Sequence, residues 1–172
     1  MHFSLSTAVI TDTIHALAAF ESLSAADEST RLLLRPLLDR ERMGLLRLMV
    51  KNAFAGIILH LLPYVDDAEL DNELPAVDPG HQSSAEEADT LLGIDLRLPA
   101  GVSGQLGSLL RRNLELAVAC RVLADSVASS STHSDAASEL ASSFTARSES
   151  AVAAMLSALR TPARPFLRSR SY

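Results

Sequence analysis

The sequence has few of the residues on which many folds and sites depend. Cys120 is the one cysteine, so no disulfide can form within the chain. Tryptophan is absent and aromatic residues make up 4% of the chain, so leucine, alanine, valine and isoleucine must build the core. That mixture favours packed helices over a β-sandwich. Lys51 is the one lysine beside fourteen arginines, and the net charge of −6 argues against a surface that binds nucleic acid generally.

A chain of 172 residues fits one domain, which we place at residues 1–160. The first residues lack the basic start of a signal peptide, and Asp12 stands early among them. The most apolar run, 53–62, is too short to cross a bilayer. We therefore expect a soluble, cytoplasmic protein with no membrane contact.

Hydrophobic periodicity predicts four helical stretches. Apolar residues recur at helical spacing over 6–23, 39–62, 103–127 and 135–160, with a linker or short helix between the first two. The predicted fold class is all-α, a helical bundle of about four main helices.

The second stretch is unusually apolar in its second half. From Ala53 to Leu62 only His60 is polar, so we expect this half to be buried on every side, by the fold or by another subunit. Gly56 costs about 1 kcal/mol relative to alanine in a helix. Close approach of a neighbouring helix is the expected compensation, and His60 is expected to be a hydrogen-bonded core histidine.

A long acidic loop is predicted at 66–92, between the second and third helices. It has nine acidic residues and no lysine or arginine, and its prolines and glycine interrupt any periodicity. One turn of helix at 84–92 is an option within it. A calcium loop needs ordered oxygen ligands around a fixed glycine, which this stretch lacks, so a solvated loop is favoured. Beyond it, the alternation of Ile94, Leu96 and Leu98 with polar residues predicts a short strand.

The third helix carries a continuous 3-4 heptad spacing with one polar member, Asn113. Its members are Leu106, Leu109, Asn113, Leu116, Cys120, Leu123 and Val127. In a coiled coil a single asparagine at such a position fixes register and oligomer state. A bundle helix in which Asn113 bonds a neighbouring side chain is the favoured alternative. A second apolar face, which includes Leu110 and Leu114, indicates packing on two sides.

No motif for catalysis, a cofactor or a metal is found. No glutamate has a histidine three residues later, as a di-iron bundle requires, and Asp12 with His15 is too small a set for a metal. The segment 101–105 lacks the last glycine of a nucleophile elbow, and no phosphate-binding lysine follows its glycines. Cys120 on an apolar helix face is expected to be inert. We predict a protein that is not an enzyme and holds no cofactor or metal.

The tail, 161–172, is basic and contains two prolines. Arg164, Arg168 and Arg170 surround the apolar Phe166. Such a segment either lies across a neighbouring subunit, with the arginines against an acidic surface, or is a disordered end. The tail is also the one part of the chain where contact with nucleic acid is conceivable.

Three patches of the sequence together resemble a small, poorly characterised helical family encoded among head and tail genes of bacterial prophages. The patches are Leu38-Asp39-Arg40-Glu41-Arg42-Met43 with Lys51-Asn52-Ala53, then Leu96 to Ser103 with Cys120 to Asp125, and finally Arg164-Pro165-Phe166. The similarity spans residues 38–170. It does not extend to the first 37 residues, and Ser126 stands where an aromatic residue would be expected.

The resemblance implies a non-enzymatic virion or assembly component, for which the head–tail junction is one location. It assigns no functional residues to this chain. Its partners would be further copies of the chain or other phage structural proteins, and its location the cytoplasm or the virion. Two other classes stay open: a ligand-binding or enzymatic bundle with a pocket between helices, and a regulatory protein-binding module.

Overall fold

The protein was analysed as a computed structural model, which describes residues 2–25, 28–39, 43–65, 91–97, 104–129 and 135–160. The chain is mostly α-helical. In order it forms β1 (His2–Ser6), α1 (Thr7–Ser24), α2 (Glu28–Leu34), the 3₁₀ turn η1 (Arg35–Leu38), α3 (Met43–Leu61), the 3₁₀ turn η3 (Leu62–Tyr64), β2 (Leu91–Asp95), α4 (Gly104–Ser129) and α5 (Asp135–Arg160).

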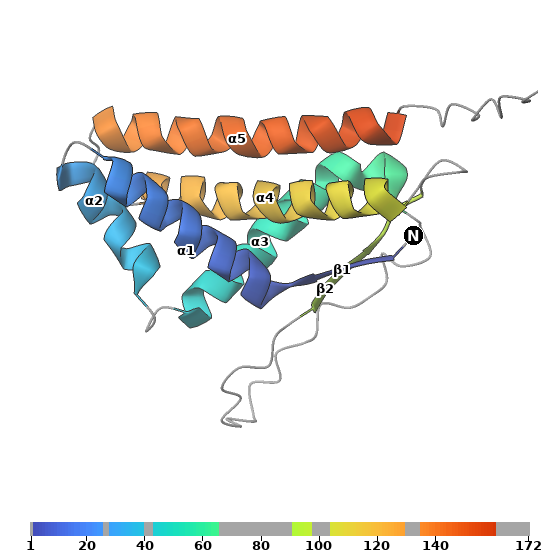
Figure 1. Cartoon of the computed structure of the whole chain (residues 1–172), viewed down its shortest axis with the longest axis horizontal. Coiled ribbons are helices and arrows are strands. Elements are labelled where there is room, and N and C mark those ends of the chain that lie inside the picture. Colours follow the sequence, from blue (N-terminus) through green and yellow to red (C-terminus); the bar gives the residue numbers. More distant parts are fainter. Residues whose placement is uncertain are drawn as a thin grey trace, which may run out of the picture.

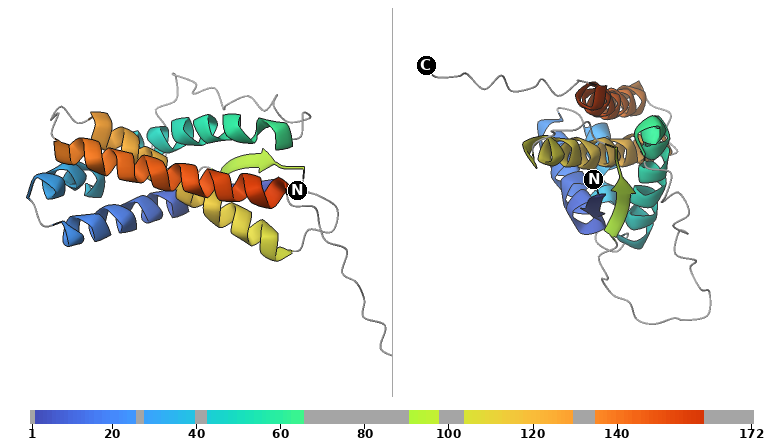
Figure 2. Two further views of the ribbon diagram at one scale, coloured as in Figure 1. Left: turned by 90° about the horizontal axis from the view of Figure 1, so that it is seen from above. Right: turned by 90° about the vertical axis from the view of Figure 1, so that its right-hand side faces the viewer.

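Helix α4 is the centre of the bundle. Helix α5 lies along one side of it, while α1 and α3 flank it on opposite sides (Figures 1 and 2). Residues 117–120 and 122–124 of α4 are all buried, which requires neighbours around the whole circumference of this segment. The expectation that this helix packs on two sides is confirmed.

The packing of α4 on α5 joins apolar side chains with one buried hydrogen bond. Phe144, Met155 and Leu159 of α5 are almost fully buried. Between them the hydroxyl of Ser148, which is also buried, donates to the carbonyl oxygen of Ala117 at 2.9 Å. A buried hydroxyl without a partner is costly, so this bond fixes how the two helices lie against each other.

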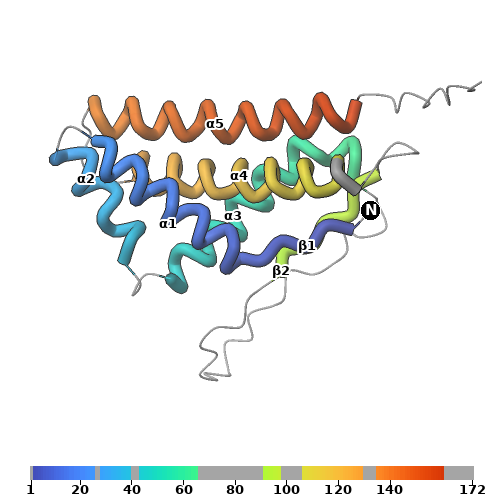
Figure 3. The backbone as a smooth tube through the Cα atoms, in the orientation of Figure 1, coloured from blue at the N-terminus to red at the C-terminus, as the bar shows by residue number. Residues whose placement is uncertain are grey.

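The two strands form one antiparallel pair, and β1 leads directly into the N-terminus of α1. His2 pairs with Asp95 and Ser6 with Leu91, and an isolated bridge joins Val65 to Leu96. Phe3 and Leu5 of β1 point into the core. The backbone then runs directly from β1 into α1 (Figure 3), and the Ser6 hydroxyl caps that helix by accepting from the Val9 amide at 3.2 Å.

Two arginines connect elements that are distant in sequence. Arg111 of α4 donates to the backbone carbonyl of Ser4 in β1. Arg147 of α5 forms an ion pair with Glu21 of α1 at 2.7 Å. Arg147 is about half exposed, so this pair sets orientation more than stability.

The structure corrects several expectations. Five α-helices are present among the described residues; the shortest, at residues 28–34, is the short helix that was one of two alternatives between the first two long helices. The predicted loop 66–92 is too long at its end, because Leu91 and Leu92 belong to β2. The strand expected at 94–98 begins earlier, at Leu91, since its pairing with β1 sets its limits. Residues 66–90 and the tail 161–172 lie outside the described part of the chain.

The second half of α3 is not buried on every side within the chain. His60 is exposed, not a core residue, and Leu59 is 66% exposed. A side-chain β-carbon placed at Gly56 would meet nothing within 4 Å, so the expected close approach of a helix is absent among the described elements. Only the inward face of α3 is covered by the described elements, because α4, α1 and α5 all contact α3 from that side.

The open space at Gly56 leads to a stability prediction. The variant Gly56→Ala should raise the free energy of unfolding by about 1 kcal/mol, because alanine loses less backbone entropy in a helix and meets no clash. Urea denaturation followed by circular dichroism measures it, with the exposed neighbour Ala55→Gly as the reverse control, expected to lose about as much. A loss of stability in Gly56→Ala would contradict the open surroundings of this residue.

Candidate functional site

Helix α3 has two apolar faces that point in opposite directions. Its inner face is buried and consists of Leu46, Val50, Ala53, Phe54, Ile57 and Leu61. A second set of residues is exposed, and we call it the outer stripe: Leu45, Leu48, Asn52, Ala55, Leu59 and, at the first position of η3, Leu62. At 3.6 residues per turn the outer stripe lies on the side of α3 opposite the inner face.

The outer stripe is more than a scatter of exposed leucines. Single exposed apolar residues are normal on protein surfaces. Here Leu45 is 58% exposed, Leu48 is 54% exposed and Leu59 is 66% exposed, all on one line along one helix. A row of exposed apolar side chains on one face of a helix is a candidate interaction surface. The end-on view places α3 at the edge of the bundle (Figure 2).

A second feature is a cleft where α3, α4 and α5 meet. It has a volume of about 470 Å³, within the range of small-molecule sites. Its wall is apolar, with the buried Ala53 and Ile57 from α3 and Val152 from α5. Gly56 and Ala153 add little side-chain volume, and these small residues are what leave the space between α3 and α5 open.

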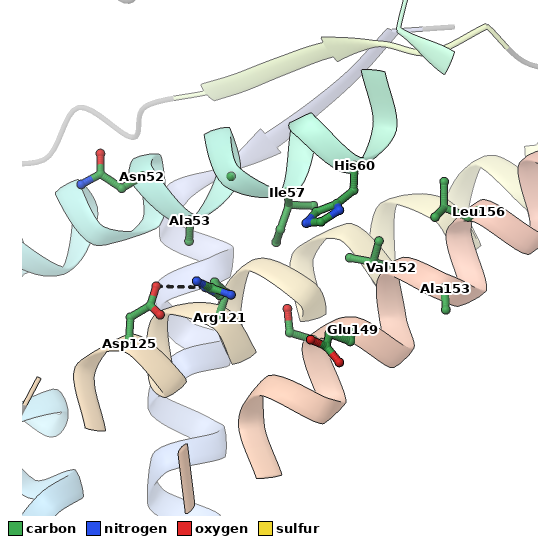
Figure 4. A pocket seen from close by; sticks show the side chains of 12 residues that line it. Asn52, Ala53, Ile57, His60, Arg121, Asp125, Glu149, Val152, Ala153 and Leu156 are labelled. Atoms are coloured by element: carbon green, nitrogen blue, oxygen red, sulfur yellow. Dashed lines mark hydrogen bonds and ion pairs between the residues drawn. The ribbon is translucent and has the colours of Figure 1, made fainter. Parts of the chain in front are cut away.

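Two of the polar side chains that line the cleft pair with each other. Arg121 and Asp125, one turn apart on α4, form an ion pair at 3.1 Å and both are about half exposed. His60 and Glu149 come from α3 and α5 on either side (Figure 4). The hydroxyl of Ser148 is used by the bond to the Ala117 carbonyl. Among the described residues, the cleft therefore presents no nucleophile hydrogen-bonded to a base.

The predicted interaction residue Asn113 is half-buried on α4. Its side chain forms no hydrogen bond within the described part of the chain, so the expected bond to a neighbouring side chain is not found. The heptad line that contains it is split: Leu109 is exposed, whereas Cys120, Leu123 and Val127 lie in the core. The other predicted interaction residues, Phe166, Arg164, Arg168 and Arg170, lie outside the described ranges.

The remaining candidates of the sequence do not come together. Asp12 is exposed, while His15 is partly buried with its Nε2 atom lacking a partner among the described residues. In the described ranges no three histidine, cysteine, aspartate or glutamate side chains are grouped as a metal site requires. The segment Met43–Tyr64 is long and apolar enough to cross a bilayer by length and composition, a test that core helices of globular proteins also pass.

Sequence reasoning missed both the outer stripe and the cleft. The 3-4 spacing of the outer stripe is present in the sequence, beside the helical spacing of the inner face. Periodicity cannot tell which of two apolar faces a fold covers. The cleft depends on how far α3 and α5 diverge, for which the only local signals are the small residues Gly56 and Ala153.

Comparison of the chain with protein-family models, with curated proteins and with solved structures gives no match.

The thiol of Cys120 provides a test of whether the middle of α4 is buried in solution. Burial raises the pKa of the Cys120 thiol, and the positive charge of Arg147 only partly offsets this. We expect a thiol reagent to modify native Cys120 at least about a thousandfold more slowly than the unfolded chain, since labelling requires the bundle to open. Fast modification with the helical signal intact would show that Cys120 is accessible.

Proposed function

We propose that the chain is a non-enzymatic structural or assembly protein that acts through helix-mediated contacts with other protein subunits. The outer stripe of α3 carries the proposal. A helix of a bundle needs one apolar face for its own core, and α3 has a second that the described part of its own chain leaves exposed. Exposed apolar surface is unfavourable in water, and burial of that surface against a partner lowers the free energy.

The phage setting of this function rests on the sequence resemblance alone. Virion and assembly proteins with that resemblance would act in a head or tail structure, with the head–tail junction as one possible place. Such assemblies are built from repeated contacts between copies or between neighbouring subunits. A surface stripe on a rigid helix suits that task, because it presents its side chains in a fixed geometry.

A ligand-binding bundle is the second candidate, and the cleft between α3, α4 and α5 favours it. The volume of about 470 Å³ would accommodate a small molecule. The cleft has an apolar wall, yet Arg121 is paired with Asp125 and Ser148 with a backbone carbonyl. Asn52, His60 and Glu149 are the polar side chains of the lining that remain for a ligand, and they come from two helices only, which makes this candidate second to the outer stripe.

The proposed function predicts that charge on the outer stripe abolishes association without unfolding the chain. In Leu48→Glu, binding to itself or to the products of neighbouring genes should weaken by at least about tenfold, because a carboxylate would be buried at the contact. Leu109→Glu is the matched control, since Leu109 is 50% exposed and Leu48 is 54% exposed. Co-expression with the neighbouring gene products, followed by co-purification and light scattering, measures both forms of binding.

The helical circular dichroism of both variants should match that of the natural chain. The proposal is contradicted if the natural chain is monomeric and binds none of the proteins encoded by the neighbouring genes. It is contradicted equally if Leu48→Glu associates as well as Leu109→Glu.

A further inference from the structure

We propose that the outer stripe of α3 is covered by the outer stripe of a second copy of this chain, with the two helices parallel and in register. This inference rests on the proposed function and names the partner of that surface. The first argument is spacing. Successive members of the stripe, from Leu45 to Leu62, are separated by three, four, three, four and three residues. This is the a/d repeat by which one helix packs on another as knobs into holes.

The position of Asn52 selects a second copy as the partner and sets its direction. With Leu45 and Leu59 at a positions, Asn52 is the a position between them, and Leu48, Ala55 and Leu62 are d positions. In a parallel, in-register pair the two Asn52 side chains face each other. The amide of each can then donate to the carbonyl of the other, which satisfies both when they are buried.

An antiparallel pair would not place the two amides in one layer of the contact. Centred on the stripe, it would place Asn52 opposite the methyl group of Ala55 and offset the two copies of Asn52 by about 4.5 Å along the helix axis. A buried amide needs a well-placed partner, so the parallel arrangement, in which the two amides face each other directly, is favoured.

The residues beside the stripe place no like charges against each other in the parallel pair. The flanking e and g positions are occupied by Gly44, Met49, Lys51, Gly56 and Ile58. Lys51 is the one charged residue of this set, and in a parallel pair it would face Gly56 of the second copy. Ala55 and Gly56 are small, so the two helix backbones can approach closely at the middle of the contact.

The contact is short, which predicts a weak dimer. From Leu45 to Leu62 the stripe runs about 25 Å on a helix about 10 Å wide, less than the surface of a typical stable interface. Dimerisation should therefore depend on protein concentration. A lipid surface is a poorer occupant, because Asn52 interrupts the stripe at its centre and the inner face of α3 is packed in the core.

Single cysteines along the stripe test the arrangement. Leu45→Cys and Leu59→Cys should each form disulfide-linked dimers under mild oxidation, at least about tenfold faster than Leu109→Cys, because equal residues meet in a parallel pair. In an antiparallel pair the two copies of residue 45 would be about 25 Å apart, beyond the reach of a disulfide. The native Cys120 is buried, so the unsubstituted chain is the background control.

A second pair of variants tests the role of Asn52. Asn52→Leu should tighten association by about tenfold or more and yield species larger than dimers, because an asparagine at this position trades stability for a defined register. Asn113→Leu on α4 is the matched control and should leave association unchanged. Sedimentation equilibrium of the full chain measures both.

Three results would overturn the inference: no preferential cross-linking at 45 and 59, no change of association in Asn52→Leu, or binding of vesicles by a monomer through the stripe. A monomer that binds a neighbouring gene product, and loses it in Leu48→Glu, would also reject the second copy as occupant. In that last case the proposed function stands.

Discussion

The structure depends on the burial of the middle of α4 on all sides. Ala117, Val118, Ala119 and Cys120 are consecutive and are all fully buried, which no single neighbouring helix can achieve. Helices α1, α3 and α5 must therefore surround this segment. The alanines keep its diameter small enough for three neighbours, and the bond from Ser148 to the Ala117 carbonyl fixes the closest of them.

This constraint explains why α3 has an unused face. α3 contacts α4, α1 and α5 from one side, so only residues on that side, such as Val50 and Ile57, enter the core. On the opposite side Leu45, Leu48 and Leu59 are more than half exposed, although Leu45 borders a small hollow that Pro36 and Leu37 also line. The divergence of α3 from α5 produces the cleft for the same reason, since both helices are positioned by α4 and small side chains separate them. The outer stripe and the cleft are thus two consequences of one central helix.

Much of the helical framework could be predicted because its signals are local. The fourth stretch was expected at 135–160 and α5 occupies those residues; the first was expected at 6–23 and α1 is Thr7–Ser24. By contrast β1 was missed. Its alternation of apolar and polar residues covers only five positions. The segment is a strand because it pairs with β2, whose Asp95 is 93 residues from His2. Pairing over that distance is not visible in local periodicity.

The candidate site was less predictable, because it depends on which faces the fold leaves open. Asn113 and Asn52 are both single asparagines in a 3-4 repeat, and the sequence alone gives no reason to prefer one. The surrounding helices decide it, since they cover most of the α4 repeat and leave that of α3 exposed. His60 illustrates the same limit: an apolar run predicted burial, but the histidine is exposed and lines the cleft.

Sedimentation equilibrium of the unmodified chain, from low micromolar to near-millimolar concentration, tests the central claim most directly. The account predicts a reversible monomer–dimer equilibrium, since a short apolar helix pair should associate weakly and stop at two copies. A mass equal to the monomer over the whole range would contradict it.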